Sequence, residues 1–263
     1  MEDILDIQQQ GGVLRLTMNR PERLNALNPA LATALRECFQ GLYRRSDIRV
    51  VILQGAGASF CAGLDLKEQQ PGKALGTSDM LAVQYSIRDI MLAMRRCPQP
   101  IISIVQGAAS GGGFALALAS DIRLATPDAR MNASFLRIGL TGCDMGVSYF
   151  LPRMVGSSVA AQYLLTGRFM DAARAHALGL VSTVAPLSEL QQEAQALAED
   201  MLRTTPLGLR FTKEALGLSL DMGSLEAVMA MEDRQQVLCT QTEDFQEGLQ
   251  AFLQKRPPHY SGQ

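Results

Sequence analysis

The 263-residue chain lacks the residue patterns that mark several common classes of protein. Its five cysteines are odd in number, widely spaced and never form a Cys-x-x-Cys pair, so they fit reduced thiols and exclude a structural zinc site. We expect no metal ion. No block of like charges occurs, and 24 Lys and Arg residues against 26 Asp and Glu residues leave a net charge of −2. We therefore expect no nucleic-acid partner.

We expect no targeting or membrane-spanning segment. The first six residues are acidic where a signal peptide would be basic, and no apolar run of signal length follows them. The stretch between Arg96 and Asp121 has no charge and is long enough for a membrane span, but Pro98, Pro100 and several polar and glycine residues interrupt it. A buried strand, a turn and a buried helix fit it better. We expect a cytoplasmic protein without a membrane partner.

Hydrophobic residues make up 47% of the chain, which is enough to build a sizeable core. Apolar and polar residues alternate on either side of Gly11-Gly12, a pattern that predicts a hairpin. Strand and helix patterns then follow one another in turn, which predicts a parallel sheet with crossover helices and an α/β fold. The expected elements are strands at 3–8, 12–18, 50–53 and 101–105, and helices at 29–45 and about 81–94.

From about Ser188 the pattern changes to helices alone, expected at 188–202, 207–220, 225–238 and 243–253. We interpret residues 1–187 as a core that binds the ligand and residues 188–263 as a helical region. Four helices without strands cannot all cover one sheet. Some of their apolar surface is therefore expected to pack against another subunit.

Two glycine-rich segments follow expected strands, but neither fits a nucleotide motif. Gly55–Phe60 starts like a dinucleotide fingerprint and has Phe60 where the third glycine belongs, while Gly107–Gly113 has the wrong spacing and no phosphate-loop lysine. Ser110 does not lie in a nucleophile-elbow pattern. Only His176 and His259 could serve it as a base, and their positions are typical of structural or exposed residues.

The glycines instead suggest exposed backbone N–H groups. Gly111–Gly113 precede the apolar run 114–119, so their amides lie at a helix N-terminus, where unpaired donors favour a developing negative charge. This would be half of an oxyanion hole, and the small residues of the loop 60–66 could supply a second donor. The alternative is that both segments are tight turns needed only for packing.

Several segments together resemble the crotonase family, the enoyl-CoA hydratase/isomerase superfamily. They are Asn19–Leu27, Phe60–Leu66, Gly107–Gly113 with Asp121, Thr166–Arg168 and Gly179–Ser182. The likeness covers nearly the whole chain and is specific for the family, though not for one reaction. It implies an α/β spiral of ββα turns, with a C-terminal helical region that drives trimers, often paired into hexamers.

The resemblance also assigns roles to individual residues. The family's oxyanion-hole amides fall on Leu64 and Gly112, which would hold the thioester oxygen of an acyl-CoA while an enolate forms. The family's two hydratase glutamates would fall on Ala115 and Phe135, so neither carboxylate is present. Water addition by two glutamates therefore cannot be assumed.

One carboxylate remains in this region. Counting back from Leu151-Pro152-Arg153 places Asp144 where dienoyl-CoA isomerases and 4-chlorobenzoyl-CoA dehalogenase carry a catalytic aspartate. We interpret Asp144 as the acid/base that transfers the proton. The alternative is that it caps a helix beginning near Met145.

Coenzyme A would enter as part of the substrate, with no separate cofactor. The resemblance implies that Arg20, Leu24 and Ala62 help to seat it, while Phe252 and Lys255 resemble contacts to its nucleotide end. An exposed lysine on a terminal helix is an equally good reading of Lys255.

The sequence thus predicts an enoyl-CoA hydratase or isomerase, a lyase or isomerase of fatty-acid or other carboxylic-acid metabolism, that forms a homotrimer or a dimer of trimers. Two alternatives stay open. One is an acyl-CoA hydrolase or dehalogenase-like enzyme, and the other is a non-catalytic acyl-CoA binding protein.

Overall fold

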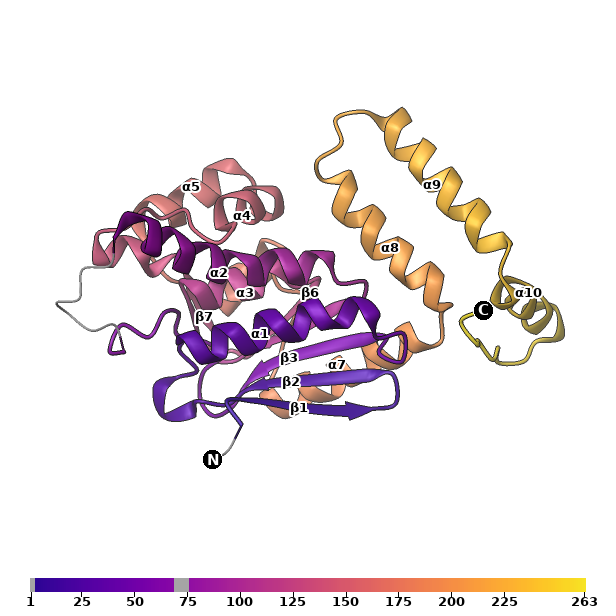
Figure 1. Ribbon diagram of the computed structural model, residues 1–263, viewed down its shortest axis with the longest axis horizontal. Helices are drawn as coiled ribbons and strands as arrows, with labels where there is room; N and C mark the ends of the chain where they lie inside the picture. Colours follow the sequence, from indigo (N-terminus) through magenta and orange to yellow (C-terminus); the bar gives the residue numbers. More distant parts are fainter. Residues whose placement is uncertain (1–2, 69–75) are drawn as a thin grey trace.

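The computed structural model describes residues 3–68 and 76–263, and its centre is a six-stranded sheet (Figure 1). The strand order is β1-β2-β3-β4-β6-β9, and every neighbouring pair is parallel except the β1–β2 hairpin. Gly11 turns that hairpin with a φ of 56°, a conformation that glycine adopts without strain. The strands are β1 (Leu5–Gln10), β2 (Val13–Met18), β3 (Val50–Gly55), β4 (Ile101–Val105), β6 (Ile122–Ala125) and β9 (Thr183–Val184). The predicted hairpin and α/β class are confirmed.

Helices cover one face of the sheet and form the main core. They are α1 (Pro29–Gly41), α2 (Thr77–Arg96) and α3 (Gly112–Ala119). Helix α1 begins where Asn28 accepts a hydrogen bond from the Leu31 amide, and Pro29 occupies the first helical turn. Every residue of α3 is buried, as expected for a helix that is apolar on all sides.

Helix α7 (Leu187–Leu202) covers the opposite face of the sheet. Its Leu190, Ala194 and Ala198 pack against Val50 and Ile52, whose side chains alternate with those that face the main core. Helix α7 therefore packs as part of the sheet's two-sided core. The predicted boundary at 187/188 stays a prediction, but the part of the chain that leaves the sheet begins after α7.

A second, smaller sheet sets the position of α3. It joins β5 (Ala108–Ser110), β7 (Arg130–Asn132) and β8 (Met170–Asp171), and the sequence patterns did not predict it. The 3-10 helix η3 (Ser134–Ile138) and the helices α4 (Val147–Val155), α5 (Ser157–Thr166) and α6 (Ala172–Ala177) follow β7 along the chain, while the 3-10 helices η1 (Pro21–Arg23) and η2 (Leu42–Arg44) flank α1. Strand β5 runs directly into the turn at Gly111, so it fixes where α3 begins.

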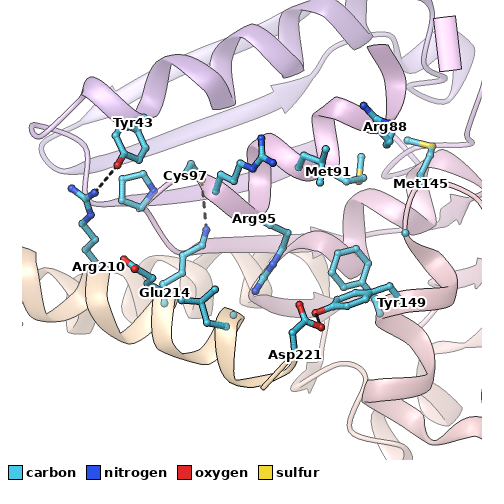
Figure 2. A pocket seen from close by; sticks show the side chains of 18 residues that line it. Tyr43, Arg88, Met91, Arg95, Cys97, Met145, Tyr149, Arg210, Glu214 and Asp221 are labelled. Carbon is cyan, nitrogen blue, oxygen red and sulfur yellow. Dashed lines mark hydrogen bonds between the residues drawn. The ribbon is translucent and has the colours of Figure 1, made fainter. Parts of the chain in front are cut away.

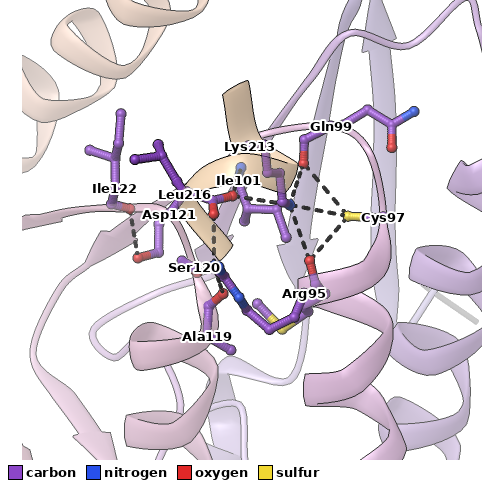
Figure 3. Close-up of polar contacts among 12 residues, drawn as sticks. Arg95, Cys97, Gln99, Ile101, Ala119, Ser120, Asp121, Ile122, Lys213 and Leu216 are labelled. Carbon is purple, nitrogen blue, oxygen red and sulfur yellow. Dashed lines mark hydrogen bonds and ion pairs between the residues drawn. The ribbon is translucent and has the colours of Figure 1, made fainter. Parts of the chain in front are cut away.

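The last three helices extend away from the sheet (Figure 1). They are α8 (Pro206–Ser219), α9 (Leu225–Thr240) and α10 (Glu243–Gln254). Buried Lys213 ties α8 to the body, because its Nζ donates to the carbonyls of Met94 (3.1 Å) and Gln99 (2.7 Å) and pairs with Asp121 (3.1 Å; Figure 3).

These helices expose large apolar side chains. Leu225 is 75% exposed, Leu253 71% and Phe252 81%. Such a surface is typical of a subunit interface, and association with another subunit stays a prediction. Across the described ranges, no helix is both long and apolar enough to cross a membrane.

Candidate functional site

The segments that carry Leu64 and Gly112 lie side by side. Cys61 forms a parallel bridge with Ala109, and its carbonyl accepts a hydrogen bond from the Ser110 amide at 3.0 Å. Gly63, with a φ of 95°, faces the turn before α3: a Cβ there would lie 3.5 Å from the Gly112 nitrogen. The two loops that sequence reasoning singled out are therefore brought together.

Both amides of interest are left without a partner in the described part of the chain. The Leu27 amide donates to the Gly63 carbonyl at 2.7 Å, and the Leu27 carbonyl accepts from the Asp65 amide at 3.0 Å. The pairing therefore involves the residues on either side of Leu64 and does not involve the N–H of Leu64. Gly112 opens α3, where a helical N–H has no acceptor four residues earlier. Within residues 3–68 and 76–263, neither N–H has a hydrogen-bond acceptor. Two adjacent free donors of this kind can stabilise a developing oxyanion. That they converge on one point stays a prediction.

Two apolar side chains and one hydroxyl lie at the start of α3, where a Cβ on Gly111 would lie 2.9 Å from Ser134 Oγ. A Cβ on Gly111 would lie 3.3 Å from the buried ring of Phe135, and Ala115 is fully buried one turn into the helix. Gly111 has a φ of 52° and a ψ of −115°, which suits glycine. Positions 115 and 135 therefore supply no proton donor or acceptor to this turn.

Asp144 is held by two hydrogen bonds to one carboxylate oxygen. Its Oδ1 accepts from Gln84 Nε2 of α2 at 2.5 Å and from the Met145 amide at 2.7 Å. Helix α4 begins at Val147, after Gly146 with a φ of 85°, and no side chain caps it. The alternative in which Asp144 caps a helix beginning near Met145 is therefore wrong, because the helix begins later and its first-turn amides do not use the carboxylate.

Met145 connects Asp144 to the amide of Gly112. Its backbone has a φ of 50°, which costs a non-glycine residue about 1 kcal/mol. Its side chain is buried, and its sulfur lies 3.3 Å from the position that a Cβ would take on Gly112. Asp144 is thus one residue away from a side chain that packs on the turn at Gly112.

The guanidinium of Arg20 bonds to groups of the protein itself. It donates to the Ala26 carbonyl and pairs with Asp65 at 2.9 Å and with Glu68 at 2.5 Å. Burial acts to raise the pKa of the Asp65 carboxyl, but hydrogen bonds from Arg20 and the Lys67 amide outweigh it, so this pKa lies below its usual value. The predicted role of Arg20 toward coenzyme A therefore stays a prediction, and the ion pairs show that the side chain braces the loop that carries Leu64.

The remaining residues predicted to bind coenzyme A fall into two groups. Leu24 and Ala62 are together, because the Ala62 amide donates to the Leu24 carbonyl at 3.0 Å beside the Leu64 loop. Phe252 and Lys255 lie on and directly after α10, which stands at the opposite end of the molecule from the segment between β2 and α1 that carries Leu24 (Figure 1). Within one chain the structure does not bring the two groups together, so a shared role in binding requires a second subunit.

A cavity of about 850 Å³ lies between α2, α4 and α8 (Figure 2). Met145 and Gly146 form part of its wall, whereas Leu64, Gly112 and Asp144 do not line it. Tyr149 also lines it, but its hydroxyl donates to Asp221 at 2.9 Å, so it is engaged away from Asp144. Among the described residues, no cluster of three or more His, Cys, Asp or Glu side chains could hold a metal ion.

Sequence reasoning missed Gln84 and Met145. Gln84 lies in an ordinary amphipathic helix, and nothing in its type or spacing marks a contact with a residue 60 positions away. Met145 gave no signal because a positive φ is anticipated at glycine and not at methionine.

Comparisons with known proteins match the chain over nearly its whole length. The family model described as enoyl-CoA hydratase/isomerase matches residues 8–263. The 1,2-epoxyphenylacetyl-CoA isomerase of Escherichia coli strain K12 is 34% identical over 263 residues, which are 100% of this chain and 99% of that protein. The (E)-benzylidenesuccinyl-CoA hydratase of Thauera aromatica is 35% identical over 257 residues, covering 95% and 96%. The crystal structure of an enoyl-CoA hydratase from Bacillus anthracis superimposes with a TM-score of 0.93 at 32% identity, covering 99% of this chain and 100% of the other.

Proposed function

Because the chain belongs to the enoyl-CoA hydratase/isomerase family, we propose that it converts an acyl-CoA thioester through an enolate held by the Leu64 and Gly112 amides, with Asp144 transferring the proton. The observation that carries this proposal is the pair of unpartnered N–H groups on adjoining turns. Such donors act where negative charge develops, and removing one from an oxyanion hole costs about a hundredfold to a thousandfold in rate.

The proposed reaction places negative charge on the thioester oxygen. Removal of a proton from the acyl chain leaves an electron pair that delocalises onto the thioester oxygen, and the two amides stabilise that oxygen. The same proton, returned at a different carbon, shifts the double bond. A single carboxylate can take the proton and give it back.

The lack of carboxylates at Ala115 and Phe135 favours isomerisation over water addition by two glutamates. Asp144 is the acidic side chain next to the residue that packs on Gly112. The name of the Escherichia coli relative, an isomerase, agrees with this choice. The reaction would serve the metabolism of fatty or other carboxylic acids in the cytoplasm.

We place coenzyme A along Leu24 and Ala62, beside the loop of Leu64, with the Arg20 loop as its neighbour. Phe252 and Lys255 would reach the nucleotide end from another subunit of a trimer or a dimer of trimers. The exposure of Phe252 and the distance of α10 from this loop support that arrangement.

The test is turnover of a panel of acyl-CoA thioesters, followed by mass spectrometry, with Asp144→Asn as the variant. It keeps the size of the side chain and removes the base, so turnover should fall about a hundredfold with little change in stability. Asp128→Asn is the matched control, because that carboxylate also accepts a local hydrogen bond, from Thr126 Oγ1 at 2.6 Å, and has no place in the site.

The outcomes separate the alternatives. Near-full activity of Asp144→Asn would refute the proton-transfer role. Release of free coenzyme A in place of a rearranged product would identify a hydrolase. Binding of thioesters without consumption of any would identify a non-catalytic acyl-CoA binding protein.

A further inference from the structure

Gln84 reaches Asp144 from a different part of the fold. It lies in α2, where its side chain is half-buried, and its Nε2 donates to Asp144 Oδ1 at 2.5 Å. The Met145 amide donates to the same oxygen at 2.7 Å. Within the described residues, the other carboxylate oxygen, Oδ2, accepts no hydrogen bond. The two oxygens of Asp144 are therefore chemically different before any substrate binds.

We propose that Gln84 is a positioning residue that holds Oδ1 of Asp144 and so makes Oδ2 the proton-accepting oxygen. This inference rests on the proposed function, because it needs Asp144 to act as the base. Two donors on Oδ1 stabilise negative charge there and prevent rotation of the carboxylate. An amide is well suited to this task, because it carries no charge and does not titrate.

The charged groups on the elements packed around Asp144 are occupied elsewhere. On α2, Arg88 lies one turn beyond Gln84, pairs with Asp89 at 2.8 Å and stacks over Tyr85. Helix α3 carries no titratable side chain.

On α4, the hydroxyl of Tyr149 is bonded to Asp221, and Arg153 stacks on its ring. Cys143, the preceding residue, is exposed. Gln84 therefore supplies the side-chain hydrogen bond that controls this carboxylate within the described structure.

The test compares kcat and KM for the unmodified chain and for Gln84→Leu. Loss of the donor frees the carboxylate to rotate, so Oδ2 is no longer held in one position and kcat should fall about tenfold. KM should change less than about twofold, since Gln84 is not required to bind the thioester.

Two further variants sharpen the result. Gln84→Glu keeps the length of the side chain but replaces the donating amide with a carboxylate, which only accepts hydrogen bonds, so kcat should fall at least as far as in Gln84→Leu. Ser86→Ala is the control, because this hydroxyl on the same helix bonds only to the Val83 carbonyl among the described groups and should leave kcat and KM unchanged.

An unchanged kcat in both Gln84 variants overturns the inference, even if their melting temperatures fall. Loss of turnover in Asp144→Asn together with an unchanged kcat in the Gln84 variants would leave the proposed function standing and refute the role of Gln84 alone. Full activity of Asp144→Asn would refute the proposed function first.

Discussion

Replacement of Gly113 by alanine should separate the two loops that form the site. A Cβ at this position would lie 2.0 Å from the carbonyl oxygen of Cys61 and 2.8 Å from its carbonyl carbon. These are backbone atoms, so no side chain can rotate away to make room. Either α3 or the strand-like segment at Cys61 must move by more than about 1 Å to restore an ordinary contact.

The cost can be worked out from what that movement breaks. The Cys61 carbonyl accepts the Ser110 amide at 3.0 Å, and this bond joins the loop of Leu64 to β5. Overpacking a core costs about 1–3 kcal/mol, and leaving a buried backbone group unpaired costs about 1–3 kcal/mol more. We expect Gly113→Ala to lower the free energy of unfolding by about 3 kcal/mol or more and to abolish turnover.

Urea denaturation at matched protein concentration measures the first effect, and the acyl-CoA assay measures the second. Gly41→Ala is the control, because Gly41 ends α1 in a helical conformation and a Cβ there meets nothing within 4 Å. That variant should gain about 0.5–1 kcal/mol of stability and keep full activity. A loss below about 1 kcal/mol in Gly113→Ala, with activity retained, would refute the close approach of the two loops.

Three other predictions concern the C-terminal region. Lys213→Met should lower the free energy of unfolding by about 3 kcal/mol in chemical denaturation, because it leaves two buried carbonyls without their donor and takes away one of the cations that pair with Asp121. An unchanged free energy of unfolding would contradict the anchoring role of Lys213. Hydrogen bonds from Arg256 and the His259 amide lower the pKa of Glu247 from 4.5 to about 2, so the stability it adds is complete above its unfolded pKa and is lost as the pH falls through the folded value. Hydrogen exchange in the tail should increase over that acidic range, and in Glu247→Gln it should be fast already at neutral pH; equal protection of the two proteins would contradict this. Sedimentation should show a trimer or hexamer that double substitution of Leu225 and Phe252 by serine weakens, whereas a stable monomer at micromolar concentration would count against a subunit interface.

The sequence predicted most elements because their local patterns match their environment. The strand expected at 101–105 has those bounds, and the helices expected at 225–238 and 243–253 differ from α9 and α10 by at most two residues at an end. The packing of α7 on the sheet was not predicted, because an amphipathic pattern shows that a face is buried and not what it is buried against.

The site was harder to derive than the fold. The glycines located the two turns, since close backbone approach requires residues without a Cβ, and the family resemblance then pointed to Leu64 and Gly112 within them. The surroundings of Asp144 could not be found in this way. They depend on a glutamine from a distant helix and on a methionine in a strained conformation, and both come from tertiary packing without a local signal.

The tie formed by Lys213 also sets an order of events as the chain folds. The four groups that it contacts, among them the Cys97 sulfur, belong to residues 94–121, and they are 92 to 119 positions earlier in the sequence. Contacts of such long sequence separation form late, because the loop between them must close first. On a ribosome, residues 94–121 emerge well before α8, so Asp121 first pairs with Arg95, at 2.8 Å, and receives Lys213 afterwards. Helix α8 therefore docks late onto the body, and α9 and α10, which carry the exposed Leu225 and Phe252, follow it along the chain.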